Sequence, residues 1–519
     1  MRTLRPAVAI LATTLAACGK SVECPAGETE CGGSCVSLAT DLDNCGSCGV
    51  AATSLQICRA GGLACAPDVG VCGGTCTDLS RDPDHCGDCA TACGAGELCL
   101  TDSGGTRCTS SCPLGYDACG GACVETTTDR LNCGACGHAC NGTQTCRAGV
   151  CAAPLEVACY ASDDVRPVTL DLLPAGAARL AQGGPTALAV GVSYFYSGNG
   201  YPGGVTVFPI DDRQAAHVVP LSGSDVEGLA AVNGALLVAN AASNSLAILA
   251  ADGTVLDEVS LGGQGTAPNP HGTALAGSTA FVALYGDGPN GFSGYAQTTG
   301  QKIALVDLTG LPGCIAGTNS DCATVAGAID LMAVSGSSDL DQGGYPFPSR
   351  VAVHGTQVYV TLANLKRADC GGGLFGYCEP AGDGKLAVID TTRLSTPPLE
   401  DAVSILDLGQ GCKNPGDIEM DGDRAWVVCG SFTFRSEAPG TVVSIDLSGP
   451  APVLGIQVDA SAVVPGGLAI CGGMGYVTDQ ASGMVLRFDP GSGLADAPVT
   501  VCPSVKSFAW AADLACLRP

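Results

Sequence analysis

Cysteine is the residue type in this chain with the clearest capacity for chemistry. The 519 residues include 33 cysteines, and 22 of these lie between Cys24 and Cys151. The stretch ECGGSCVSLATDLDNCGSCG at 30–49 sets four of them as C-x3-C and C-x2-C, separated by nine residues. Four thiolates at such spacings can hold zinc, a C-x2-C pair can serve in redox chemistry, and paired cysteines can form disulfides.

The cysteine pattern occurs in three copies, which begin near Cys24, Cys65 and Cys112 and share gaps of 6, 3, 9 and 2 residues. The two complete copies hold eight cysteines each, more than one zinc ion uses, and the whole chain has five histidines. The acidic flanks disfavour the thiolate that a redox pair needs. The pattern therefore favours a disulfide framework without a metal.

The first copy indicates which cysteines pair in the other two. Ala52 stands where the other copies have their sixth cysteine, and if Cys65 opens the second copy, the first also lacks the eighth. The alternative is that Cys65 ends the first copy, because CRAGGLAC at 58–65 is similar to CRAGVC at 146–151. Joint loss of two cysteines is what pairing between them would leave. It predicts Cys93–Cys108 and Cys140–Cys151.

Ten more cysteines follow in the rest of the chain, again an even number. Cys314–Cys322 and Cys370–Cys378 are predicted to close short loops. Cys412–Cys429 is predicted at one end of a hairpin, and Cys502–Cys516 is predicted to repeat that arrangement near the C-terminus. These four pairs leave Cys159 with Cys471.

The remaining candidate residues are aromatic or charged. Three enlarged loops, 285–301, 365–384 and 430–440, concentrate aromatic side chains in a chain that has only 4% of them. They form a recognition surface, or they pack on one another and cover the fold. The candidates for a binding face are Tyr285, Phe292, Tyr295, Phe375, Tyr377, Phe432, Phe434, Arg350 and His271, with Tyr196, Tyr201, Tyr345 and Phe347 beside them. Glu227 and Asp417 start inner strands, as Arg350 does, and could line a channel.

The elements that position these residues are β-hairpins. A strand ending in an acidic residue recurs as QKIALVD, GKLAVID, GTVVSID and GMVLRFD, and a two-strand unit such as PSRVAVHGTQVYVTL precedes each copy. We expect the acidic ends to cap turns. Six hairpins start near Pro185, Asp225, Pro270, Pro348, Pro415 and Pro465. A seventh blade would combine SFAWAADLACLRP at the C-terminus with EVACYASDDVRPVTLDL at 156–172. The fold class is all-β: a small disulfide-rich repeat region and a β-propeller, with seven blades favoured and six possible.

The first residues, MRTLRPAVAILATTLAACGK, have the features of an export signal. Arg2 and Arg5 precede an apolar stretch that is too short to span a bilayer, so 1–17 is interpreted as a signal peptide. LAAC at 15–18 resembles the lipobox of bacterial lipoproteins, and the resemblance implies that Cys18 is the lipidated N-terminus, followed by a linker at 18–23. Gly19 favours the outer membrane in that family's sorting pattern. Secretion with Cys18 removed or disulfide-bonded is the alternative.

Two further resemblances concern the domains. CGGxCV…D…NCGxCG in 24–151 resembles Stig1-type cysteine-rich domains and similar repeats of bacterial surface lipoproteins, which implies a spacer or interaction module. Residues 155–519 resemble the NHL/YVTN/YncE-like propellers through the repeated V-x-x-I-D strand.

Charge and motifs restrict the function. A net charge of −27 disfavours nucleic acid and anionic lipid surfaces as partners. No G-x-S-x-G, HExxH or EF-hand motif is present, and His271 and His354 stand isolated. We expect no metal and no cofactor. The prediction is a non-enzymatic protein of the bacterial outer membrane, lipid-anchored and facing the periplasm or the surface, whose propeller binds a protein or a glycan. The alternatives are an exported propeller enzyme, such as a metal-dependent or lactonase-like hydrolase, and a purely structural component.

Overall fold

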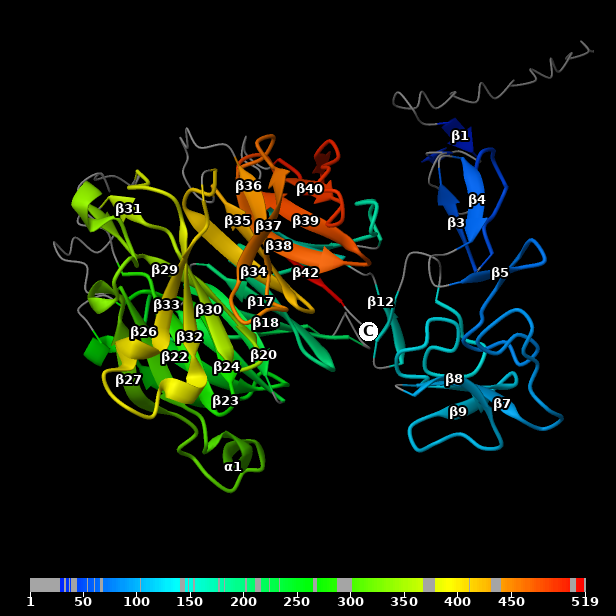
Figure 1. The fold of residues 1–519 in the computed structure, drawn as a ribbon, viewed down its shortest axis with the longest axis horizontal. Helices are drawn as coiled ribbons and strands as arrows, with labels where there is room; N and C mark the ends of the chain where they lie inside the picture. The colour runs from blue at the N-terminus through cyan, green and yellow to red at the C-terminus, as the bar shows by residue number, and fades with distance from the viewer. Residues whose placement is uncertain are drawn as a thin grey trace, which may run out of the picture. The chain divides into compact units, whose positions relative to one another are not determined.

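The computed structural model describes most of the chain after residue 28 (Figure 1). The described residues are 29–31, 34–36, 38, 44–53, 55–59, 61–65, 69–102, 104–140, 145–147, 149–152, 155–175, 178–181, 183–200, 203–210, 216–223, 225–232, 234–264, 268–286, 301–366, 379–409, 411–430, 440–504 and 510–517. The chain divides into two compact units, Met1–Leu114 with Ala118–Val124 and Gly115–Asp117 with Glu125–Pro519. Within the described ranges, no helix has the length and apolarity to cross a membrane.

Short antiparallel hairpins make up the cysteine repeats. The strands are β1 (Thr29–Cys31), β2 (Ser34–Val36), β3 (Gln56–Arg59), β4 (Gly62–Cys65), β5 (Gly70–Cys72), β6 (Thr75–Thr77), β7 (Leu98–Asp102), β8 (Gly105–Thr109), β9 (Asp117–Cys119), β10 (Ala122–Val124), β11 (Thr145–Arg147) and β12 (Val150–Ala152). The CGG sequence recurs in each copy, and in the second copy it forms the turn of a hairpin. Gly73 and Gly74 both adopt positive φ, at 60° and 86°, as the two-residue turn between β5 and β6 requires.

The disulfides of the repeats follow one order in every copy. In the second copy the first cysteine pairs with the third, the second with the fifth, the fourth with the seventh and the sixth with the eighth. The bonds are Cys65–Cys76, Cys72–Cys89, Cys86–Cys99 and Cys93–Cys108. The other described bonds obey the same order: Cys31–Cys48, Cys45–Cys58, Cys112–Cys123, Cys133–Cys146 and Cys140–Cys151. Both predicted pairs are present, and the bond to Cys76 shows that Cys65 opens the second copy.

The second unit contains seven four-stranded antiparallel sheets among its described residues. Six are built from consecutive strands. From the innermost strand outwards, three of these are β16 (Pro185–Val190), β17 (Tyr194–Asn199), β18 (Gly204–Pro209) and β19 (His217–Val219); β20 (Val226–Val232), β21 (Ala235–Asn240), β22 (Ser245–Ala250) and β23 (Val255–Ser260); and β24 (Pro270–Ala276), β25 (Thr279–Leu284), β26 (Lys302–Asp307) and β27 (Thr324–Asp330).

The other three consecutive sheets have the same organisation. They are β29 (Pro348–His354), β30 (Gln357–Leu362), β32 (Lys385–Asp390) and β33 (Val403–Asp407); β34 (Pro415–Asp421), β35 (Arg424–Cys429), β36 (Thr441–Asp446) and β37 (Val453–Asp459); and β38 (Pro465–Cys471), β39 (Met474–Asp479), β40 (Met484–Phe488) and β41 (Val499–Thr500). A short helix, α1 (Leu311–Ile315), and the pair β28 (Gly344–Tyr345) and β31 (Leu365–Lys366) lie in the connections.

The seventh sheet joins the two ends of the propeller. Its innermost strand is β42 (Ala511–Cys516), followed by β13 (Leu155–Cys159), β14 (Asp164–Val168) and β15 (Arg179–Leu180). The innermost strands of all seven sheets contact one another in sequence, and β42 lies between β38 and β16, so the ring is closed. The favoured seven blades and the composite seventh blade are therefore confirmed.

The core lies between neighbouring blades. One cluster joins Leu237 and Ile248 of one blade to Val282 and Val306 of the next, all fully buried. The acidic strand ends cap turns as expected: Asp307, for example, accepts a hydrogen bond from the amide of Thr309 at 3.0 Å. Backbone packing is close at the inner strands, where a Cβ added to Gly228 would lie 1.9 Å from the carbonyl oxygen of His271. Glycine in VEG and PHG therefore lets adjacent inner strands approach.

The propeller disulfides agree with the sequence prediction in part. Cys314–Cys322 and Cys412–Cys429 are present, and Cys370 and Cys378 lie outside the described residues. The predicted Cys502–Cys516 pair is wrong, and so is the pair that it left over. The bonds are Cys159–Cys502 and Cys471–Cys516.

The error has a topological cause. In the ordinary blade, Cys412 precedes the inner strand and Cys429 ends the second strand. In the composite blade the second strand is β13 from the beginning of the propeller, so the equivalent partner of Cys502 is Cys159, which ends β13. Cys516 ends the inner strand itself and pairs with Cys471, which ends the neighbouring inner strand β38.

Candidate functional site

A cavity of about 430 Å³ runs along the centre of the ring. Inner strands of the blades line it, and the charged side chains on its wall are Glu227, Arg350, Asp417, Glu419 and Asp513. Because the strands of each blade are antiparallel, all inner strands start at one face of the ring, which we call the strand-start face.

Local irregularities in the inner strands position these charged residues. The pairing of β20 with β21 shifts between Val226 and Gly228, so Glu227 is an extra residue without a partner in the ladder. The pairing of β29 shifts in the same way between Pro348 and Val351, and that of β34 between Pro415 and Ile418. A β-bulge bends the strand and changes the direction of a side chain. This repeated bulge places Glu227, Arg350 and Asp417 on the channel wall.

Arg350 forms the centre of the polar network. Its Nη1 donates a hydrogen bond of 2.7 Å to the backbone oxygen of Glu227, which belongs to another blade. Its Nε lies 4.0 Å from Oδ1 of Asp417. The guanidinium is therefore already engaged by two blades, and it is the only cation on the wall of this cavity among the described residues.

Asp417 and Asp513 link adjacent inner strands. Oδ2 of Asp417 accepts the amide of Leu468 at 2.8 Å, and its Oδ1 accepts the amide of Ile418 at 2.9 Å. Asp513 does the same two blades further on, where its Oδ2 accepts the amide of Leu188 at 2.7 Å. Each carboxylate thus ties two blades together while facing the cavity.

The carboxyl groups carry more negative charge than the site can balance. Burial is the main cause that raises the pKa of Asp513 to about 7, and the charge of Asp417 adds to it. Burial also raises the pKa of Asp225, beside Glu227, to about 7. The pKa of Glu227 is raised by burial although Arg350 opposes the shift, and the same holds for Asp417.

Two aromatic pairs lie at the strand-start face near these carboxyls. His271 stacks on Tyr285, with ring centroids 4.4 Å apart and planes 8° from parallel. The ring centroids of Tyr160 and Trp510 lie 4.5 Å apart. Burial raises the pKa of Tyr285 to about 12, and the charge of Glu227 contributes. Burial and the charges of Asp225 and Glu227 also raise the pKa of Tyr160, so both aromatic pairs lie within electrostatic reach of Glu227.

The structure brings together only some of the predicted residues. Arg350, Glu227 and Asp417 line the cavity, and His271 and Tyr285 stand beside it. Phe347 is buried against Tyr285, and Tyr196 is a core residue whose hydroxyl donates to the carbonyl of Ala251. Tyr345 packs in the Phe347 cluster, and His354 lies 3.2 Å from Asp423. The predicted residues outside the described ranges are Cys18, Tyr201, Phe292, Tyr295, Phe375, Tyr377, Phe432 and Phe434.

Asp513, Asp225, Tyr160 and Trp510 were missed by the sequence reasoning. A signal for Asp513 does exist, because ADLAC at 512–516 matches GDIEM at 416–420 in the position of its aspartate. Aligning the C-terminal strand with the other inner strands would have given Asp513 the position equivalent to Asp417 on the cavity wall.

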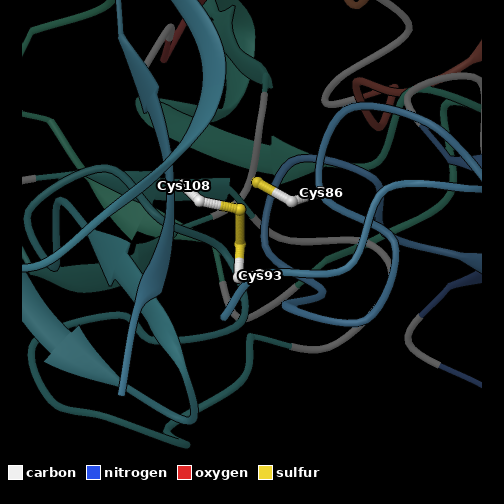
Figure 2. A group of neighbouring side chains, drawn as sticks. All are labelled: Cys86, Cys93 and Cys108. Carbon is white, nitrogen blue, oxygen red and sulfur yellow. A yellow bond between two sulfur atoms is a disulfide. The ribbon is translucent and has the colours of Figure 1, made fainter. Parts of the chain in front are cut away.

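Sulfur atoms also converge in the cysteine repeats. The Sγ atoms of Cys86, Cys93 and Cys108 lie within 4.8 Å of one another (Figure 2), and those of Cys133, Cys140 and Cys151 form a similar group. Each of these cysteines is part of a disulfide, so none offers a thiolate to a metal. Proximity here reflects two adjacent disulfides.

Comparisons with known proteins found one family match and several solved structures of low similarity. Residues 101–154 match the stigma-specific STIG1-like protein family. No curated protein matches the chain at the level of sequence. A putative 6-phosphogluconolactonase from Bacteroides fragilis is similar in structure, with 14% identity, 70% of this chain and 96% of that chain covered, and a TM-score of 0.46.

Two further solved structures are similar over the propeller. BamB from Moraxella catarrhalis shares 16% identity, with 69% of this chain and 89% of that chain covered and a TM-score of 0.36. A streptogramin B lyase shares 12% identity, with 61% and 82% covered and a TM-score of 0.40. At these identities the likeness concerns the fold alone, and the activities of those proteins say nothing about this one.

Proposed function

We propose that this is a lipid-anchored protein of the bacterial outer membrane, attached through Cys18, whose propeller binds a protein or glycan partner at the strand-start face. One observation carries the binding role: charged side chains from four of the seven blades line a single cavity, and two aromatic pairs lie within electrostatic reach of Glu227 on its wall. A concave site with few, convergent polar groups is the usual form of a binding site.

The cysteine repeats serve as a spacer between the anchor and the propeller in this proposal. Their short hairpins bury few apolar side chains other than cysteine, so disulfides provide most of their stability. The lipobox at 15–18 supports the anchor, and the repeated V-x-x-I-D strand supports membership of the NHL/YVTN/YncE-like propellers.

A hydrolytic enzyme is the second candidate, because one observation favours it. Asp225 and Asp513 have pKa values near 7, where a carboxyl group can donate or accept a proton at neutral pH. Asp513, however, accepts amide hydrogen bonds at both of its oxygens, from Leu188 and Leu514. Its geometry is that of a group joining two blades, so binding remains the better-supported role.

The test compares the intact protein with a single-residue variant of the cavity wall. Glu227→Gln removes a charge while keeping the size and polarity of the side chain. The control is Asp401→Asn, a matched change at an exposed position on the outer part of another blade. Both proteins and the wild type, extracted in detergent, are applied to a glycan array and used to capture partners from envelope extracts.

We expect the wild type and Asp401→Asn to capture the same partner and Glu227→Gln to lose it. Mass spectrometry of the mature N-terminus should find Cys18 acylated. Capture that is equal for all three proteins would contradict a role for the cavity. Turnover of an ester or lactone substrate by the wild type, lost in Glu227→Gln, would favour the enzyme instead.

A further inference from the structure

We propose that the cavity at the strand-start face accepts the protonated amine of an amino sugar within a glycan. This inference rests on the proposed binding function and specifies the chemistry of the ligand. The site that it describes consists of the cavity wall at Glu227, Thr273, Arg350, Asp417 and Asp513, with the two aromatic pairs beside it.

The charge of the wall is the first argument. Four carboxyl groups line the cavity, at Glu227, Asp417, Glu419 and Asp513, against the single guanidinium of Arg350. The single positive charge of Arg350, which also donates a hydrogen bond to the backbone of Glu227, cannot neutralise four carboxylates. Burial raises the pKa of Glu227 and of Asp513 although the charge of Arg350 opposes the shift. A bound ammonium group would supply the missing charge.

A buried hydroxyl is the second, independent argument. Thr273 lines the same cavity and is only 5% exposed, and its Oγ1 has no hydrogen-bond partner among the described residues. A buried polar group without a partner costs free energy, and such groups are rare in native proteins. A ligand amine or hydroxyl that reached this wall could pair with Thr273 on one side and Glu227 on the other.

The aromatic pairs favour a sugar over a bare ion. The rings of His271–Tyr285 and Tyr160–Trp510 add aromatic surface near Glu227, and aromatic rings also attract organic cations. A cavity of about 430 Å³ is far larger than a metal ion requires. Among the described residues, the only groups of three potential ligands within 4.8 Å are disulfide cysteines, so the carboxylates do not form a compact metal cage.

The groups that titrate near the bound amine can be named from every strand around it. They are Asp225, Glu227, Asp417, Glu419, Asp513, His271, Tyr160 and Tyr285, with Arg350 as the fixed cation. An ammonium group favours the ionised form of each carboxyl, so its binding at pH 7 should release protons from the site.

The experiment uses the intact protein in detergent and two matched probes. The first probe is a glucosamine trimer, which carries amines, and the second is its N-acetylglucosamine counterpart, which has nearly the same shape without the charge. Calorimetry at pH 7 in two buffers of different ionisation enthalpy measures the affinity and the number of protons released. A lysine-containing peptide is the third probe, so that an amine on a protein can be distinguished from one on a sugar.

We expect the glucosamine trimer to bind at least about tenfold more tightly than the acetylated one, with proton release. Glu227→Gln should reduce this affinity by about tenfold or more. Thr273→Val, which keeps the shape of the side chain, should also weaken binding, and it should raise the melting temperature because it removes an unpaired hydroxyl. Asp401→Asn should behave as the wild type.

Three results would overturn the inference in different ways. Equal or tighter binding of the acetylated trimer, still lost in Glu227→Gln, would refute the amine and leave the proposed binding function in place. Tighter binding of the lysine peptide would replace the sugar by a protein. If no probe binds and Glu227→Gln captures the same partners as the wild type from envelope extracts, the cavity is not the binding site and both proposals fail.

Discussion

The bond between Cys159 and Cys502 should contribute more to stability than any other described disulfide of the propeller. It joins residues 343 apart in sequence, whereas Cys412–Cys429, in the equivalent place of an ordinary blade, joins residues 17 apart. The perturbation is the double replacement Cys159→Ala with Cys502→Ala, and the matched control is Cys412→Ala with Cys429→Ala.

The two double variants differ almost only in the loop that the disulfide closes. All four cysteines are at most 1% exposed, so the loss of packing should be similar in both variants. In the chain-entropy relation, closing the longer loop destabilises the unfolded state by about 5.8 kcal/mol at 25 °C and closing the shorter one by about 3.1 kcal/mol. The Cys471–Cys516 bond shortens the longer path only slightly. The expected difference is about 2.7 kcal/mol.

Urea unfolding of the oxidised proteins measures this difference directly. Tryptophan fluorescence is a suitable signal, since Trp426 is fully buried. The free energy of unfolding should fall for both double variants, and more for the pair at 159 and 502. Mass spectrometry must first show that the remaining disulfides are unchanged in each protein.

Equal losses in the two variants would refute the reasoning, because they would mean that loop length has no part in the effect. A larger loss for the pair at 412 and 429 would have the same meaning. Either result would place the stabilisation in native contacts around the sulfur atoms.

Two further predictions concern the inner strands. Gly272→Ala should lower the free energy of unfolding by about 1–3 kcal/mol in urea, because its Cβ would lie 2.5 Å from the carbonyl oxygen of Ser349. Gly263→Ala, with open space around the new methyl group, should be nearly neutral. Burial raises the pKa of Asp225 and Asp513 to about 7, so the folded protein retains protons that the unfolded chain releases above about pH 4. The free energy of unfolding should therefore fall as the pH rises from about 4 to 7, by on the order of 1.4 kcal/mol per pH unit for each group. Asp225→Asn should reduce that slope. An unchanged slope would contradict the raised pKa of Asp225.

Much of the propeller could be predicted because its strands repeat in the sequence. GKLAVID and GTVVSID each form the third strand of a blade. The aspartate at the end of each caps the following turn through a local hydrogen bond, which the sequence alone can indicate. The seventh blade could also be predicted. After six hairpin units were assigned, strand-forming segments remained at both ends of the propeller, and together they make one blade.

The parts that failed depend on contacts between distant segments. The partner of Cys502 could not be read from nearby residues, because the second strand of its blade lies more than 300 residues earlier in the chain. The charged wall of the cavity was found in part, since the bulges that direct Glu227 and Arg350 inwards recur after a similar strand start. Asp513 was missed because the C-terminal segment was assigned to the composite blade without aligning its residues with the other inner strands.

The composite blade distinguishes a propeller that includes β42 from one that stops earlier. A polypeptide that stops before Cys502 can form six blades, but it lacks β42, and Cys159 and Cys471 then have no partners for their bonds. Such a fragment would expose two thiols and the unpaired edge of β13, both of which oxidative folding machinery and proteases can recognise. Both bonds and the pairing of β13 with β42 therefore form only when the chain extends through Cys516.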